Sequence, residues 1–318
     1  MNFLYFLAEH RNSFFTAIMS AITYIGDEIG FLLIALFIYW CVDKNGGYYI
    51  FCLAFSGILL NQCIKISARI ERPWVRDPGF NAVESAKKRA EGYSFPSGHT
   101  QNAVGTLGGA ALISKHKAIK IILPTLALLV AFSRMYLGVH TPTDVLFSVI
   151  LAVFLVFLFK LIFDYCIGSF KRMNILFASL VVLSVCAMIY IFNMESSGIT
   201  DDALSYFINN RASAEKNAVI MLACSIGMWG IYLTDTLYTH FDVRGTPIMQ
   251  TVKFSVGIII MLALKSGLKA ILGTSLTATF IRYFILILIG GGVYPMFFGK
   301  IQKLFRYNKT EQKTTSSL

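Results

Sequence analysis

Long apolar runs separated by short polar segments make up most of this chain of 318 residues. We identify ten such runs, at residues 12–25, 29–42, 47–65, 98–114, 119–137, 143–165, 174–193, 217–238, 250–272 and 277–298. They are about 14–23 residues long, close to the length with which an α-helix crosses a bilayer core. None alternates apolar and polar residues as barrel strands do. Since only helices and closed barrels satisfy their backbone in lipid, the pattern predicts an all-α membrane protein, a polytopic helical bundle.

Composition supports a chain that lives in a membrane. Hydrophobic residues make up 56% of it and charged residues 14%, with a mean hydropathy of +0.65, whereas soluble domains carry about a quarter charged residues. The start MNFLYFLAEHR has neither a basic segment nor a small-residue cleavage site, so we expect no removable signal peptide. The net charge of +11 is typical of basic cytoplasmic loops, and we expect no nucleic-acid partner.

Basic connections predict the orientation of the helices. Residues 115–120, residues 171–172 and the basic polar tail 299–318 fall on one side by parity, which we predict to be cytoplasmic. Loop 66–96 breaks this rule, because it lies on the opposite side and is also strongly basic. Its cations are Arg69, Arg72, Arg76, Lys87, Lys88 and Arg89. Charge placed against the topological rule needs another explanation, and we looked for one in the motifs around this loop.

Three short motifs lie at helix ends that parity brings to the same membrane surface. They are Lys65 followed six residues later by Arg72–Pro73, then Pro96-Ser97-Gly98-His99, then SRMYLGVHTPTD with Ser133, Arg134, His140 and Asp144. Each begins or ends one of four neighbouring apolar runs. The motifs can therefore converge although they are spread over some eighty residues of sequence.

The cationic members of these motifs are suited to hold a phosphate. Lys65, Arg72 and Arg134 supply three positive charges, and the two guanidinium groups match paired oxygens. Ser97 and Gly98 begin a helix, whose free N–H groups and positive dipole end favour an anion. The same three cations would repel a divalent metal, so we predict no metal site and no cofactor.

The remaining members have reactive side chains. A neutral His140 can attack phosphorus as a nucleophile. Asp144 can accept the other ring N–H of His140 and fix its tautomer. His99 can give a proton to the leaving oxygen and then activate water.

Each residue taken alone also has a structural explanation. Asp144 can cap a helix together with Thr141, and Ser97 can cap the helix that follows it. Lys65 at the end of an apolar run can extend to the membrane interface. His99 alone is more often an ordinary polar loop residue. The catalytic interpretation depends on the joint spacing of the motifs on one face.

That joint pattern, K-x6-RP, PSGH and SR-x5-H-x3-D, resembles the three-part signature of the type-2 phosphatidic acid phosphatase superfamily. The match is complete at Lys65, Arg72, Pro73, Pro96, Ser97, Gly98, His99, Ser133, Arg134, His140 and Asp144. The resemblance covers about residues 1–190 and implies a six-helix core and metal-independent phosphatase activity. It implies His140 as nucleophile, Asp144 as its partner and His99 as acid, with phosphate bound by Lys65, Arg72, Ser97, Gly98 and Arg134.

We divide the chain accordingly. Residues 1–193 are predicted to form the phosphatase core of six or seven helices, with motifs at 65–73, 96–99 and 133–144. Residues 194–298 add about four transmembrane helices after a polar loop at 195–216, and residues 299–318 form the tail.

The predicted function is hydrolysis of a lipid phosphate or diphosphate on the extracytoplasmic face of a membrane, such as the bacterial plasma membrane. Candidate substrates are isoprenoid diphosphate, phosphatidate, phosphatidylglycerol phosphate and sphingoid phosphates. We also expect loop 74–95, with Trp74 and Phe80, to lie at the interface and gate substrate entry. Two alternatives stay open: a phosphotransferase that uses the same phosphohistidine, and a lipid or anion carrier that only binds.

Overall fold

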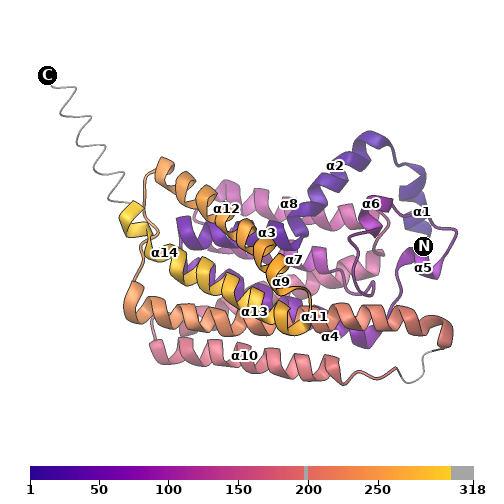
Figure 1. Ribbon diagram of the computed structural model, residues 1–318. Coiled ribbons are helices and arrows are strands. Elements are labelled where there is room, and N and C mark those ends of the chain that lie inside the picture. The colour runs from indigo at the N-terminus through magenta and orange to yellow at the C-terminus, as the bar shows by residue number, and fades with distance from the viewer. Residues whose placement is uncertain (197–199, 302–318) are drawn as a thin grey trace. The chain divides into compact units, whose positions relative to one another are not determined.

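The computed structural model describes residues 1–196 and 200–301, and all regular structure in these residues is helical. The expected all-α class is confirmed. In chain order (Figure 1) the elements are α1 (Asn2–Glu9), α2 (Ser13–Thr23), η1 (Tyr24–Gly26), α3 (Glu28–Phe37), η2 (Ile38–Val42), α4 (Lys44–Ala68), α5 (Pro73–Arg76), α6 (Glu84–Lys87), α7 (Gly98–Ile113), α8 (Lys117–Tyr136), α9 (Pro142–Cys166), α10 (Phe170–Phe192), α11 (Asp201–Thr234), η3 (Asp235–Thr239), α12 (Pro247–Leu272), α13 (Leu276–Ile287), η4 (Leu288–Val293) and α14 (Tyr294–Met296).

Within the described residues, seven helical stretches are long and apolar enough to cross a membrane. They are Lys44–Arg76, Lys117–Tyr136, Pro142–Cys166, Phe170–Phe192, Ala203–Thr239, Pro247–Leu272 and Leu276–Ile301. The first two apolar runs form a pair bent by 57° between Ser13–Gly26 and Glu28–Val42, which brings the count to eight if the pair is one span. The run at 98–114 forms α7, which has 16 residues and is shorter than these spans.

Contacts divide the chain into two compact units. Unit 1 comprises Met1–Ala35 and Tyr49–Leu222, and unit 2 comprises Leu36–Tyr48 and Ala223–Leu318. All three motifs lie in unit 1. The functional boundary at residue 193 that the sequence suggested stays a prediction. Most of the predicted tail, residues 302–318, lies outside the described residues.

The polar loop predicted at 195–216 is wrong over most of its length, because α11 begins at Asp201. Its first turns carry Phe207, Ala214 and Ala218 on one face, and these side chains are buried against Ile66 and Tyr93. The spacing of seven and then four residues is that of a helix with one apolar face. The segment is polar on average, so its mean hydropathy hid this face.

In unit 1, helices α7, α8 and α9 lie side by side (Figure 1). Side-chain caps mark the starts of two of them. The Ser97 hydroxyl accepts a hydrogen bond from the Thr100 N–H at the start of α7, and Thr141 forms a capping box with Asp144 at the start of α9. Each cap includes a motif residue, Ser97 in the first and Asp144 in the second, so helix geometry positions both.

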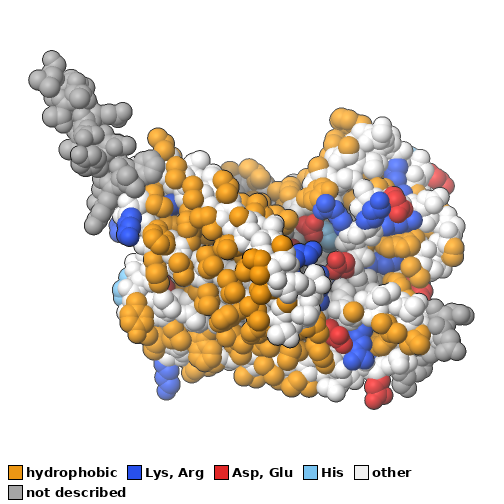
Figure 2. Space-filling view, viewed as in Figure 1, with side chains coloured by type: hydrophobic (Ala, Val, Ile, Leu, Met, Phe, Trp, Pro, Cys, Tyr) orange, Lys and Arg blue, Asp and Glu red, His pale blue; other side chains and the backbone are white. Residues whose placement is uncertain are grey.

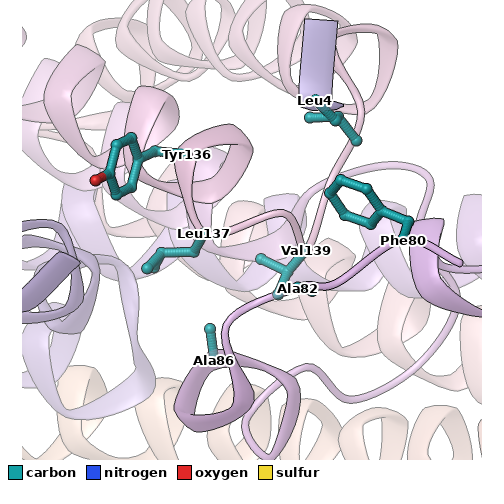
Figure 3. Close-up of a cluster of buried hydrophobic side chains, with 7 residues drawn as sticks. All are labelled: Leu4, Phe80, Ala82, Ala86, Tyr136, Leu137 and Val139. Carbon is teal, nitrogen blue, oxygen red and sulfur yellow. The ribbon is translucent and has the colours of Figure 1, made fainter. Parts of the chain in front are cut away.

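A buried apolar cluster fixes the segment that joins α8 to α9 (Figure 3). Its members are Leu4, Phe80, Ala82, Ala86, Tyr136, Leu137 and Val139. The cluster joins α1, the loop around Phe80 and the residues just before His140. Phe80 is only 1% exposed, so its side chain packs inside the protein rather than against lipid, and the gating role of loop 74–95 stays a prediction. Loop 74–95 is anchored by its own apolar residues.

Unit 2 has a core of aromatic residues and glycine carbonyls. The Tyr39 hydroxyl donates to the Gly291 carbonyl and the Trp40 ring N–H to the Gly290 carbonyl, both at 2.9 Å. Lys253 is fully buried, and its ammonium donates to the Trp40 carbonyl at 3.1 Å. These bonds connect the π-helical turns η2 and η4 within this unit.

Exposed apolar side chains cover α12 and α13 on the face shown in Figure 2. On α12 they include Ile248, Val256, Ile259, Leu262, Ile271 and Leu272. In the same view, charged side chains gather around α6 and α1 in unit 1 (Figure 2). A soluble protein rarely exposes so large an apolar surface, and a lipid environment accounts for it.

Gly138 lies two residues before His140 in the segment that joins α8 to α9, and it is closely packed. Its φ is +77°, and an added Cβ would lie 2.9 Å from the ring of the buried Phe80. Gly168, between α9 and α10, has a similar φ of +83° with no atom within 4 Å of an added Cβ. A substitution at Gly168 therefore reports backbone strain alone, whereas one at Gly138 reports strain together with steric overlap.

We expect Gly168→Ala to cost about 1–2 kcal/mol from left-handed strain alone. Gly138→Ala should cost roughly 1–3 kcal/mol more, because the guanidinium of Arg11 and the ring of Phe80 must both move. Thermal melting of the two variants in detergent measures the difference. Equal melting temperatures would show that the segment before His140 is not packed as described.

Candidate active site

The structure brings the predicted site residues to one end of unit 1. Lys65 lies near the end of α4, Arg134 near the end of α8, and Gly98 and His99 in the first turn of α7. The remaining members, Arg72, Ser97, His140 and Asp144, stand within three residues of a helix start. The ends of five helices, α4, α5, α7, α8 and α9, therefore supply the site.

Arg72 is held by backbone carbonyls and points at His140. The side chain is 3% exposed. Nε donates to the Gly92 carbonyl at 3.0 Å, Nη2 to the Glu91 carbonyl at 2.7 Å, and Nη1 to the Val139 carbonyl at 3.0 Å. Nη1 also lies 2.8 Å from His140 Nε2. The guanidinium is thus fixed beside the nitrogen that would attack phosphorus.

His140 lies between this guanidinium and the carboxylate of Asp144. Its Nδ1 is 3.5 Å from Asp144 Oδ2, within ion-pair distance, and both side chains are 2% exposed. The same oxygen accepts hydrogen bonds from the Ser94 hydroxyl at 2.6 Å and the Thr141 N–H at 2.8 Å. Asp144 therefore caps α9 and also faces His140, so the two interpretations of this residue hold together.

Burial lowers the pKa of His140 well below its ordinary value, since a buried site disfavours the charged imidazolium. The neighbouring cations Arg72, Arg134 and Lys65 lower the pKa further, and the backbone of Ser94 opposes them. His140 is consequently neutral near pH 7. A neutral ring keeps the lone pair that a nucleophile needs.

Lys65 is buried rather than extended to the membrane surface. It is 5% exposed, and its ammonium donates to the Tyr93 carbonyl. It interacts electrostatically with Arg72, Arg134 and Asp144. The structure thus excludes the explanation of Lys65 as an interface lysine.

Arg134 carries the donors best suited to an anion. It is 1% exposed, and its Nη1 donates to the Thr23 hydroxyl at 2.6 Å. Nε and Nη2 are buried and have no hydrogen-bond partner among the described residues. Buried unpaired donors on a charged group are costly, and an oxyanion would satisfy both of them.

Ser97 and Gly98 form the start of α7 beside these cations. The Ser97 hydroxyl serves as the helix cap, 2.9 Å from the Thr100 hydroxyl. An added Cβ at Gly98 would make only ordinary contact, 3.6 Å from Asn61 Oδ1. Neither a left-handed φ nor a steric contact within the protein requires glycine here. Close approach of a ligand to the backbone is the remaining physical reason.

Two residues of the site were missed in the sequence. Thr23 accepts the hydrogen bond from Arg134, and Asp27 Oδ1 lies 3.6 Å from His99 Nε2. Thr23 is the last residue of α2 and Asp27 lies in the turn before α3, and neither belongs to the three motifs. Among the described residues, no group of three His, Cys, Asp or Glu side chains is placed to hold a metal ion.

Fold and site together define a helical membrane protein with a buried cationic site around a neutral histidine. The pattern of the PAP2 superfamily matches residues 45–168, and that of the PAP2 superfamily phosphatase transmembrane extension matches residues 219–307. The chain belongs to the PAP2 superfamily and is a membrane phosphatase. The family resemblance inferred from the three motifs is confirmed.

Curated relatives are bacterial lipid phosphatases. Undecaprenyl-diphosphatase BcrC of Bacillus subtilis is 30% identical over 48% of this chain and 76% of its own length. Phosphatidylglycerophosphatase B of the same species is 30% identical over 51% of this chain and 81% of its own length. A crystal structure of a transmembrane PAP2 type phosphatidylglycerolphosphate phosphatase from Bacillus subtilis is 29% identical, with a TM-score of 0.44 over 53% of this chain and 86% of that chain.

Gly98→Ala tests whether the start of α7 receives an anion. We expect the variant to fold normally, because the protein has room for the methyl group, but to bind inorganic phosphate at least about tenfold more weakly, a loss of ~1.4 kcal/mol. Inhibition by phosphate and thermal melting measure the two effects. Gly105→Ala is the matched control, since an added Cβ two turns further along α7 meets nothing within 4 Å. Unchanged phosphate inhibition in Gly98→Ala would contradict the assignment.

Proposed function

We propose that this protein removes a phosphate from a lipid phosphate or diphosphate through a phosphohistidine on His140, without a metal ion. One observation carries the proposal. His140 Nε2 lies 2.8 Å from Arg72 Nη1, while Nδ1 faces Asp144 at 3.5 Å. The ring is therefore oriented with one nitrogen toward the cations and the other toward a carboxylate. This is the arrangement that a histidine nucleophile needs.

The proposed reaction has two steps. Nε2 of His140 attacks phosphorus, the P–O bond to the lipid breaks, and the leaving oxygen takes a proton from His99. Water then attacks the phosphohistidine and gives a proton to His99, and the N–P bond breaks with its electron pair returning to His140. Lys65, Arg72 and Arg134 would neutralise charge on the phosphoryl oxygens, which dominates phosphoryl-transfer catalysis.

A lipid is the substrate that the placement of the site favours. The site lies at the ends of membrane helices, so a headgroup can enter while its tail stays in the bilayer. The names of three relatives, an undecaprenyl-diphosphatase, a phosphatidylglycerophosphatase and a lipid A 1-phosphatase, all denote release of phosphate from a lipid. We therefore propose an isoprenoid diphosphate or a glycerolipid phosphate such as phosphatidate.

The distribution of charge supports an extracytoplasmic site. Basic residues at 115–120 and 171–172 lie between helices at the end opposite the site by chain parity, and such residues collect on the cytoplasmic side. Together with the bacterial origin of the relatives, this favours a bacterial plasma membrane with the site on its outer face.

Purified protein in excess EDTA should release phosphate from one or more of isoprenoid diphosphate, phosphatidate and phosphatidylglycerol phosphate. His140→Ala should lose at least about a thousandfold, since it removes the covalent route. A colorimetric phosphate assay measures both. His116→Ala, in the exposed connection before α8, is the matched control. Activity that EDTA abolishes, or that survives in His140→Ala, would contradict the mechanism, and phosphate transfer to an added acceptor without release would identify a phosphotransferase.

The pH dependence tests the protonation state of His140. As pH falls through its lowered pKa, the ring gains a proton and loses its nucleophilic lone pair. The acid limb of kcat/KM should therefore lie below the ordinary histidine pKa of about 6.5. The profile must be corrected for titration of the substrate phosphate, whose second pKa is about 6. A corrected acid limb above 6.5 would show that His140 is charged in the free enzyme.

A further inference from the structure

The turn between α2 and α3 reaches into the site from a part of the chain that carries none of the three motifs. Within unit 1, η1 contacts both α7 and α8. Gly26 lies against the backbone of His99, because an added Cβ would be 2.7 Å from the His99 carbonyl oxygen. Only a glycine permits this approach. The next residue, Asp27, is thereby placed beside the His99 ring.

Asp27 has two separate contacts, one for each carboxylate oxygen. Oδ1 lies 3.6 Å from His99 Nε2, and Oδ2 lies 3.1 Å from Nη1 of Arg89. The Arg89 guanidinium also stacks over the Tyr24 ring at 4.0 Å. Arg89 thus holds the carboxylate from outside while the other oxygen faces the site. A distance of 3.6 Å is longer than a hydrogen bond, so the interaction with His99 is electrostatic.

Burial lowers the pKa of His99 well below its ordinary value, and the other charged groups near the ring lower the pKa further. Lys65, Arg72 and Arg134 are cations, and His140 repels a second imidazolium when it is charged. A general acid must nevertheless carry a proton when the leaving oxygen departs. A carboxylate within 4 Å stabilises the imidazolium against these cations.

We propose that Asp27 is a positioning residue that orients His99 and favours its protonated form, so that the ring can donate its proton to the leaving lipid oxygen. The inference rests on the proposed function, in which His99 is the acid. It adds a residue outside the three motifs and explains why the α2–α3 turn lies against α7. The step itself is unchanged: the P–O bond breaks, and the proton of His99 moves to the alkoxide oxygen.

Leaving-group dependence distinguishes this role from a structural one. Phosphatidate has an alkoxide leaving group, which needs a proton, whereas the nitrophenolate of p-nitrophenyl phosphate departs without one near neutral pH. We expect Asp27→Asn to lower kcat/KM for phosphatidate by about tenfold or more, part of the ~100- to 10,000-fold that a general acid supplies. For p-nitrophenyl phosphate the loss should stay within about threefold. His99→Gln should show the same selectivity with a larger loss.

The alkaline limb of the phosphatidate profile gives a second readout. Without the carboxylate, the imidazolium loses its proton at lower pH, so the limb should move to lower pH in Asp27→Asn. Asp27→Glu, which keeps the charge, should restore both the limb and most of the activity. Glu84→Gln is the matched control. Glu84 pairs with Lys87 in the basic loop that also carries Arg89, so the variant removes one carboxylate from an ion pair near Asp27's own partner. Melting temperatures verify folding of every variant.

A double-mutant cycle completes the test, because residues that act through one another are not additive. In a His99→Gln background, Asp27→Asn should cause no further loss with phosphatidate. Equal losses on both substrates, an unmoved alkaline limb or full additivity with His99→Gln would overturn the inference. Those results leave the proposed function standing as long as wild type is active and His140→Ala is not. An inactive wild type would overturn the proposed function, and the role of Asp27 with it.

Discussion

Mutual repulsion among three buried cations is the constraint around which the site is built. Lys65, Arg72 and Arg134 are each at most 5% exposed and lie close enough to interact. Removing such charges from water costs several kcal/mol per ion. Backbone carbonyls, two carboxylates and the Thr23 hydroxyl offset part of this cost. An anionic ligand that accepts hydrogen bonds from the unpaired donors of Arg134 would offset more of this cost. The free energy spent on burying the cations therefore favours binding of an anion.

The loop between α4 and α7 shows how this constraint shapes the surrounding chain. Carbonyls of residues 91–93 accept from Arg72 and Lys65. Tyr93 is in turn buried against the first half of α11. On the other side, Phe80 and its cluster (Figure 3) hold the residues before His140. The basic loop between α4 and α7 therefore supports the site on two sides. Helix α11 in turn packs against this loop at Tyr93.

Differences in environment suit the two histidines to the different roles proposed for them. His140 lies deep among Arg72, Arg134 and Lys65, which favours its neutral, nucleophilic form. Burial and the same cations lower the pKa of His99 too, but its side chain is less buried than that of His140 and has the carboxylate of Asp27 at 3.6 Å. Nucleophile and acid need opposite protonation states at one pH. A carboxylate brought in by the α2–α3 turn is a direct way to provide the difference.

The sequence alone determined the helical class, the family and the set of motif residues, because apolar run length and fixed spacing are local properties. It also pointed to convergence, since parity assigns helix ends to one surface. Tertiary structure decided what depends on contacts between distant segments. Thr23 and Asp27 join the site where the chain bends by 57° between α2 and α3 and η1 packs against α7 and α8. Phe80 is buried in a cluster that includes Leu4 of α1, and the apolar face of residues 207–218 packs against Ile66 and Tyr93. Such packing arises from pairs of side chains far apart in the chain, and no local pattern encodes it.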